Sequence, residues 1–87
     1  MKKAGDGVFQ LECTGRTVNC FVVHAEVPVL VDAGAELQGR AVVEELRAAG
    51  VTPEFVLLTH ADFDHSGGAA AVREALWHPR AGKARVF

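Results

Sequence analysis

The sequence predicts one α/β domain whose elements follow the order β-β-β-α-β-α-β. Three observations support this prediction. Short runs of Val, Leu and Phe read as strands, and two longer segments repeat their apolar residues at helical spacing. Gly or Pro marks most of the boundaries between them. With 87 residues, the chain is long enough for one domain at most.

The first two strands are predicted to form a hairpin. Residues 1–6 are polar and are expected to be frayed, so the domain itself is expected to span 7–87. Strand-forming residues follow over 7–12 and again over 17–24. The turn Thr14-Gly15-Arg16 separates these runs, which favours antiparallel pairing.

Two cysteines, Cys13 and Cys20, accompany this hairpin. Their spacing fits neither a C-x-x-C redox motif nor a zinc knuckle. We expect them to be small apolar strand residues in a reducing compartment.

Two further strands, 29–31 and 55–58, are apolar without alternation, which predicts burial on both faces. The first follows Pro28, a residue that suits the start of a strand. It ends at Asp32-Ala33-Gly34, where an acid and a glycine mark a turn.

The first predicted helix, residues 36–49, presents an apolar stripe at helical spacing. The stripe consists of Val42, Val43, Leu46 and Ala49. Gly50 is placed to end this helix as its C-terminal cap. A second helix is predicted over 68–77, and a last strand over 84–87.

The composition argues against two classes of partner. Nine Lys and Arg stand against 11 Asp and Glu, and no basic stripe indicates nucleic acid. No apolar run approaches the roughly 20 residues that a membrane span needs. Asp6 and Glu12 also interrupt the apolar segment that a signal peptide would require. We therefore expect a soluble, cytoplasmic protein that does not bind membranes.

The chemistry is concentrated directly after the 55–58 strand. Two imidazoles and two carboxylates, those of His60, Asp62, Asp64 and His65, lie within six residues. Such nitrogen and oxygen donors suit zinc, iron and manganese, and α/β folds place their sites at the carboxyl ends of strands. The alternative interpretation is a polar loop in which Asp64 or Ser66 caps the next helix.

This motif resembles the H-x-H-x-D-H signature of the metallo-β-lactamase superfamily. The hairpin and the Asp32-Ala33-Gly34 turn resemble that superfamily's opening segment, and the order of elements matches over 7–87. The resemblance implies that the chain forms the N-terminal half of an αββα sandwich. It implies a metal-dependent hydrolase that uses a metal-bound water or hydroxide.

The resemblance also implies residue roles. His60 and Asp62 would contribute to a first metal site, Asp64 and His65 to a second, and Asp64 would also be catalytic. Asp32 would lie beside the site, either as a structural acid or as an acid that orients the metal ligands by hydrogen bonds. The expected cofactor is one or two zinc ions, with iron or manganese as alternatives because Asp62 replaces a histidine by a harder ligand.

The superfamily's later metal ligands have no counterpart in this sequence. His78 follows His65 too closely to be the third histidine, so we expect it to end a helix or lie in a loop, and His24 to be an edge residue. The activity of this chain alone is therefore uncertain. The expected partners are a small-molecule substrate and a second copy of the chain or a complementing C-terminal half. The alternative function is a non-catalytic metal-binding or self-associating half-domain.

Overall fold

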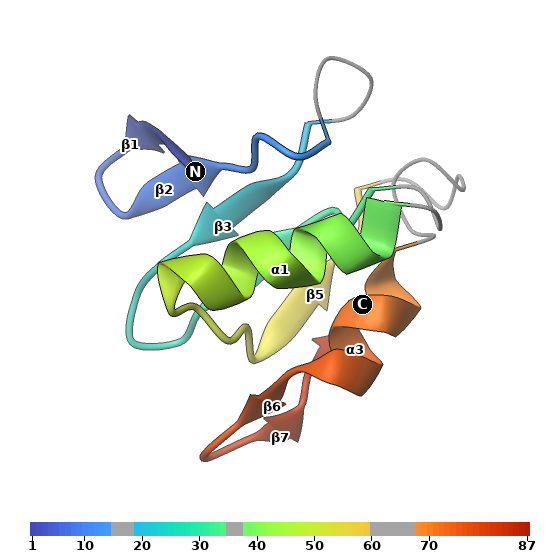
Figure 1. Ribbon diagram of the computed structural model, residues 1–87. Coiled ribbons are helices and arrows are strands. Elements are labelled where there is room, and N and C mark those ends of the chain that lie inside the picture. The colour runs from blue at the N-terminus through green and yellow to red at the C-terminus, as the bar shows by residue number, and fades with distance from the viewer. Residues whose placement is uncertain (15–18, 35–37, 60–67) are drawn as a thin grey trace.

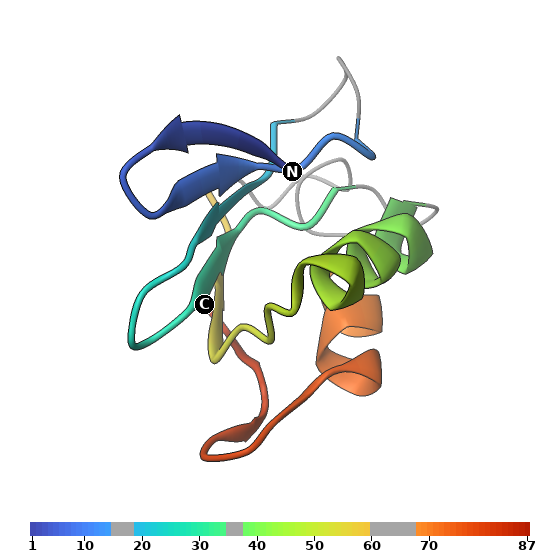
Figure 2. The same cartoon turned by 60° about the vertical axis from the view of Figure 1, so that its left-hand side comes forward.

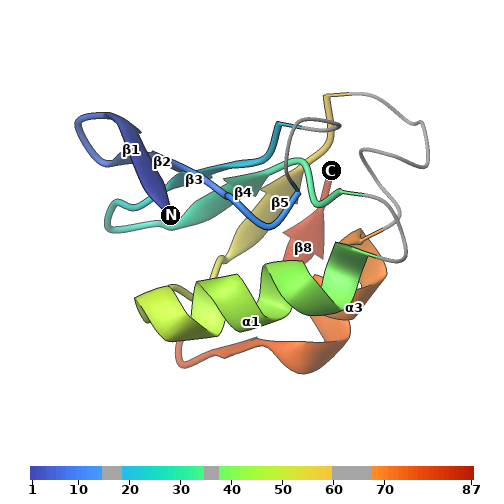
Figure 3. The same ribbon diagram turned by 45° about the horizontal axis from the view of Figure 1, so that its top comes forward.

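The computed structural model describes residues 1–14, 19–34, 38–59 and 68–87. A six-stranded sheet forms one layer, and both helices pack on the same face of it (Figures 2 and 3). The α/β class predicted from the sequence is confirmed.

The main sheet has the strand order β1-β2-β3-β4-β5-β8 (Figures 1 and 3). The strands are β1 Lys2–Gly5, β2 Val8–Gln10, β3 Phe21–Val23, β4 Val29–Val31, β5 Phe55–Leu57 and β8 Arg85–Val86. Neighbours from β1 to β4 are antiparallel, whereas β4, β5 and β8 are parallel. The carboxyl ends of β4 and β5 therefore meet at one edge of the sheet.

Two helices and a small hairpin complete the described chain. Helix α1 spans Gly39–Ala49 and helix α3 spans Ala69–Ala75. Strands β6, Trp77–His78, and β7, Gly82–Lys83, pair only with each other and form a separate two-stranded sheet.

The core lies between the helices and the sheet. Strand side chains alternate between the two faces, and the fully buried row is Val22, Leu30 and Val56. The helices contribute buried apolar side chains to the same cluster, among them Val42, Leu46 and Val72. Packing against this row is what fixes α1 and α3 on one face of the sheet.

The opposite face of the sheet, called the open face below, has no covering layer among the described residues. Its centre is apolar and consists of Phe21, Val23, Val29, Val31, Phe55, Leu57 and Phe87. Leu57 is 43% exposed and Phe87 is 63% exposed. The expectation that strands 29–31 and 55–58 are buried on both faces is therefore wrong, because helices cover only one of them.

The predicted order of elements is confirmed, with two additions. Residues 1–6, expected to be frayed, contain β1, which pairs antiparallel with β2. This edge strand is stabilised by its neighbour and not by any apolar pattern of its own. The second addition is the β6–β7 hairpin, which follows because Leu76 leaves the helix in an extended conformation with ψ 131°.

The helix boundaries also differ from the prediction. Helix α1 begins at Gly39, and residues 36 and 37 of the predicted helix lie outside the described residues. Its cap at Gly50 is confirmed, with φ 71° and an amide that donates to Arg47 O. Ala49 was predicted to lie in the apolar stripe, but it is exposed and borders a hollow of about 280 Å³. Within the described ranges, no helix is long and apolar enough to cross a membrane.

Candidate metal centre

Asp32 links the ends of the two central parallel strands. It follows β4 directly, its side chain is almost fully buried, and its φ of 62° is the one positive value of a non-glycine residue in the described chain. Asp is among the few residues that adopt this left-handed conformation readily. Its amide donates to Leu57 O at 2.8 Å, which carries the β4–β5 ladder one residue further.

The Asp32 carboxylate holds Thr59 in two ways. Asp32 Oδ1 accepts a hydrogen bond from the Thr59 amide at 2.9 Å, and Oδ2 accepts one from Thr59 Oγ1 at 2.7 Å. Bonds to an ionised acceptor are stronger than those between neutral groups. Because Thr59 directly precedes His60, this contact fixes the start of the segment that carries the candidate metal ligands.

The far end of the same segment is held by the same turn. The Gly68 amide donates to Gly34 O at 2.9 Å. A Cβ added at Gly68 would overlap with Ala33 O, so only glycine permits this approach. Residues 32–34 therefore clamp the chain at Thr59 and at Gly68, on both sides of residues 60–67.

The four predicted ligands, His60, Asp62, Asp64 and His65, lie outside the described residues. Their roles stay predictions. Within the described ranges, no group of three or more His, Cys, Asp or Glu side chains is placed to hold a metal ion. The role of Asp32 beside such a site is likewise untested, although its contact with Thr59 places it one residue from His60.

His78 lies at the opposite end of the sheet. It is buried in β6, and its Nδ1 accepts hydrogen bonds from the Arg80 and Ala81 amides at 3.1 and 3.3 Å. The same nitrogen lies 4.0 Å from Glu54 Oε1. The imidazole stabilises the β6–β7 turn. It was expected to end a helix or lie in a loop, and a strand residue is found instead.

Neither cysteine has the lowered pKa that is typical of a nucleophilic thiol. Cys13 lies in a turn after β2 and Cys20 just before β3, so the expected strand positions are wrong. Partial burial of the thiol and its contact with Glu45 raise the pKa of Cys13 to about 12, although the residue as a whole is exposed. Burial raises the pKa of Cys20 to about 11. Both thiols stay protonated, whereas the thiolate is the reactive form.

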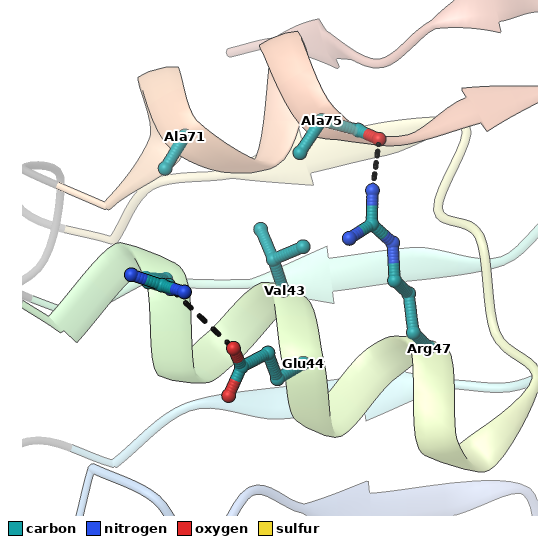
Figure 4. Close-up of a pocket in the computed structure, with 6 residues that line it drawn as sticks. Val43, Glu44, Arg47, Ala71 and Ala75 are labelled. Carbon is teal, nitrogen blue, oxygen red and sulfur yellow. Dashed lines mark hydrogen bonds and ion pairs between the residues drawn. The ribbon is translucent and has the colours of Figure 1, made fainter.

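A hollow in the described part of the chain is lined by none of the cysteines or candidate ligands. It has a volume of about 370 Å³ and runs between the two helices on the outside of the molecule (Figure 4). Its lining residues are Arg40, Val43, Glu44, Arg47, Ala71 and Ala75. Arg47 donates to Ala75 O at 2.9 Å and so satisfies a carbonyl at the end of α3. We assign no substrate to this hollow, because its lining offers one carboxylate and no imidazole.

Comparison with known protein families gives a match over most of the chain, including the strand ends described above. The sequence model of the Metallo-beta-lactamase superfamily matches residues 13–85, which include the Asp32 turn and both clamped ends. The chain belongs to the metallo-β-lactamase superfamily.

Individual members of the superfamily match the chain over part of their own length. A probable metallo-hydrolase of Bacillus subtilis (strain 168), YqgX, is 37% identical over 54 residues, which make up 62% of this chain and 25% of that protein. A metallo-β-lactamase from Cronobacter sakazakii superposes with a TM-score of 0.78 and 20% identity, over 98% of this chain and 32% of the other. A subclass B3 metallo-β-lactamase from a soil metagenome gives a TM-score of 0.72 at 19% identity, over 92% and 29%. At these identities, the two solved structures support the fold alone.

Sequence reasoning missed the part that three described residues play around the candidate metal centre, among them Gly39, whose backbone lies against that of Gly68. Thr59 and Gly34 were not singled out as the groups that hold the segment ends, and Gly39 was not connected with Gly68. A hydroxyl residue at the carboxyl end of one parallel strand, beside an acid at the end of its neighbour, was the available signal for Thr59. The carbonyl of Gly34 and the position of Gly39 carry no signal in the sequence, because both contacts depend on how α1 and α3 pack.

Proposed function

We propose that this chain is the metal-binding part of a metal-dependent hydrolase, with His60, Asp62, Asp64 and His65 as the metal ligands. The observation that carries the proposal is the pair of clamps from residues 32–34 to Thr59 and Gly68. Fixed ends reduce the entropy that a short ligand-bearing segment loses when it binds a metal. Superfamily membership supplies the reaction class.

The donor set has the right chemistry for the metal. Two imidazoles and two carboxylates suit zinc, and one or two zinc ions are the proposed cofactor. The carboxylate at Asp62 adds negative charge to the first site and makes iron or manganese the alternatives. A metal bound there would lower the pKa of a bound water and polarise the bond to be hydrolysed. Asp64 would contact both metal and reacting water, and Asp32 would hold the backbone beside His60.

Metal titration of the purified chain tests this proposal. We expect the chain to bind one or two zinc ions, measured by native mass spectrometry and by competition with a chromophoric chelator. Removing two ligands in His60→Ala/His65→Ala is expected to weaken binding by about a hundredfold or more. His24→Ala is the matched control, because His24 is exposed and remote from the motif. A chain that binds no metal, or a double variant that binds as well as the unmodified chain, would overturn the proposal.

The open face supports a second part of the proposed function, which is association with another α/β half-domain. Its apolar centre includes the exposed side chains of Leu57 and Phe87, and exposed apolar patches can mark interaction sites. The matched segments make up only 25% and 32% of the two proteins described above, so the chain spans only part of the length of each. The proposed substrate is a small molecule.

We commit to a complementing C-terminal half as the occupant, in preference to a second copy. Along the open face, β1 carries Lys2 at one edge and β8 carries Arg85 at the other. A two-fold axis parallel to the strands would bring Lys2 of one copy to the edge that carries Arg85 of the other, and an axis across the strands would bring each cation to the same edge as its own copy. Like charges oppose each other in both arrangements. A partner sheet with acidic edges fits better, and a homodimer without metal chemistry is the outcome that would support the non-catalytic alternative.

A further inference from the structure

Three glycines meet where the two helices begin. Gly39 is the first residue of α1, Gly68 directly precedes α3, and Gly34 ends the turn that contains Asp32. A Cβ built on Gly39 would lie 3.3 Å from Gly68 Cα, and one built on Gly68 would lie 3.3 Å from Gly39 Cα. The backbones of the two helix starts are therefore in direct contact, with no side chain between them.

We propose that Gly39 is a positioning residue for the metal-binding segment, acting through Gly68. The inference rests on the proposed function, since it concerns how that segment is held. Gly39 contacts no candidate ligand. It allows α3 to approach closely enough for the Gly68 amide to reach Gly34 O at 2.9 Å, and this hydrogen bond fixes the end of the chain that emerges from residues 60–67.

The available space determines what a side chain at Gly39 would do. Its Cβ would lie 2.7 Å from Ala71 Cβ, one turn into α3. Carbon atoms in contact are normally about 3.5–4.0 Å apart, so the two helices would have to separate by roughly 1 Å. Neither atom belongs to a flexible side chain that could turn aside. The displacement would move Gly68 as well, because it directly precedes α3.

A shift of this size matters for a metal site. A metal site needs its ligand side chains held within about 0.5 Å of the geometry that binds the metal. The other clamp, from Asp32 to Thr59, does not involve α1 or α3 and would stay in place. Gly39 is therefore expected to affect one end of the segment and leave the other unchanged, which a general loss of folding would not do.

The test uses Gly39→Ala with two companion variants. The first companion, Gly39→Ala/Ala71→Gly, removes the methyl group that lies nearest to the new Cβ. The second, Gly5→Ala, is the matched control, because a Cβ there meets no atom within 4 Å. Alanine is preferred to glycine inside a helix by about 1 kcal/mol, so Gly39→Ala is expected to fold.

Two quantities are measured: amide hydrogen exchange of the metal-free chain by NMR, and zinc affinity by chelator competition. In Gly39→Ala we expect the Gly68 amide to exchange about tenfold faster while the Thr59 amide is unchanged, and zinc affinity to fall about tenfold. The double variant Gly39→Ala/Ala71→Gly should restore the Gly68 exchange rate and the zinc affinity. Gly5→Ala should change neither quantity.

The outcomes separate this inference from the proposed function. Unchanged Gly68 exchange and unchanged zinc affinity in Gly39→Ala would overturn the inference and leave the proposed function standing. A double variant as impaired as the single one would overturn it too, because the clash with Ala71 would then not be the cause. An unmodified chain that binds no zinc would overturn the proposed function and this inference with it.

Discussion

Glu45 connects helix α1 to the backbone that follows β2. Its carboxylate accepts hydrogen bonds from the Glu12 amide at 3.0 and 3.1 Å and from the Cys13 amide at 2.9 Å. The terminal amine of Met1 lies 3.2 Å away. Burial alone would raise the pKa of Glu45, but the hydrogen bonds from the two amides outweigh it and hold the pKa below its usual range.

This lowered pKa gives the stability of the protein a predictable pH dependence. A carboxyl group whose pKa is lower in the folded than in the unfolded chain stabilises the fold above the unfolded pKa, and the gain is lost as pH falls through the folded pKa. We expect Glu45→Gln to lower the free energy of unfolding by about 1–2 kcal/mol at pH 7. The difference from the unmodified chain should shrink below about pH 4.

Urea denaturation between pH 3 and pH 7 measures the effect. Glu44→Gln is the matched control on the same helix, because Glu44 is 64% exposed and pairs only with Arg40 across the surface. It should change the free energy of unfolding by less than about 0.5 kcal/mol. If the free energies of unfolding of Glu45→Gln and the unmodified chain differed by the same amount at every pH, the lowered pKa of Glu45 would not be the cause.

At the scale of elements, Asp32 joins the carboxyl ends of β4 and β5, and two substitutions separate its contributions. Asp32→Asn keeps an acceptor for the Thr59 amide and tolerates the positive φ, so we expect it to cost less than about 1 kcal/mol. Asp32→Ala loses both hydrogen bonds to Thr59 and is strained at φ 62°, so we expect about 2–4 kcal/mol.

Denaturation midpoints of the two Asp32 variants provide the measurement, with Asp6→Ala as the control because Asp6 is exposed in the β1–β2 turn. Equal losses for the Asn and Ala variants would show that the carboxylate's hydrogen bonds to Thr59 do not hold the strand ends together.

The elements differ in how well their sequences predicted them. Helix α1 and strands β2 to β5 were predictable, because apolar residues such as Val42 and Leu30 repeat at the spacing of the structure they form. Strand β1 was not, because Lys2 and Lys3 are polar and the strand exists by pairing with β2. The β6–β7 hairpin was missed since its two-residue strands are too short to show a pattern.

In the candidate site, too, some residues could be predicted from the sequence and others depend on tertiary contacts. Residue types alone made His60, Asp62, Asp64 and His65 candidate metal ligands, since two imidazoles and two carboxylates seldom occur so close together, and these roles stay predictions. The clamp residues depend on tertiary contacts. Asp32 could be noticed as an acid before a glycine, but its bonds to Thr59 require β4 and β5 to be neighbours. The contact of Gly39 with Gly68 requires the helices to be packed.

At the scale of the whole molecule, the charges at the edges of the open face underlie our proposal for its partner. Lys2 at one edge and Arg85 at the other disfavour a second copy, because a two-fold arrangement opposes cations in either orientation. The exposed apolar centre still favours association, so the two effects compete. We therefore expect the unmodified chain to sediment as a monomer at about 10 μM, a concentration at which a weak, repulsive interface does not form.

Reversing one edge charge should shift this balance. In Arg85→Glu, a two-fold axis parallel to the strands would place a carboxylate near Lys2 of the other copy, twice per dimer. Exposed ion pairs contribute up to about 1 kcal/mol each, so we expect dimerisation to strengthen by about fivefold to thirtyfold and to weaken again in high salt. Arg73→Glu makes the same charge change on α3, away from the open face, and should leave sedimentation unchanged. If Arg73→Glu promoted dimers equally, net charge would be responsible and the argument from the edges would fail. A tight dimer of the unmodified chain would instead make a second copy the occupant of the open face, because its apolar contacts would then outweigh the repulsion between Lys2 and Arg85.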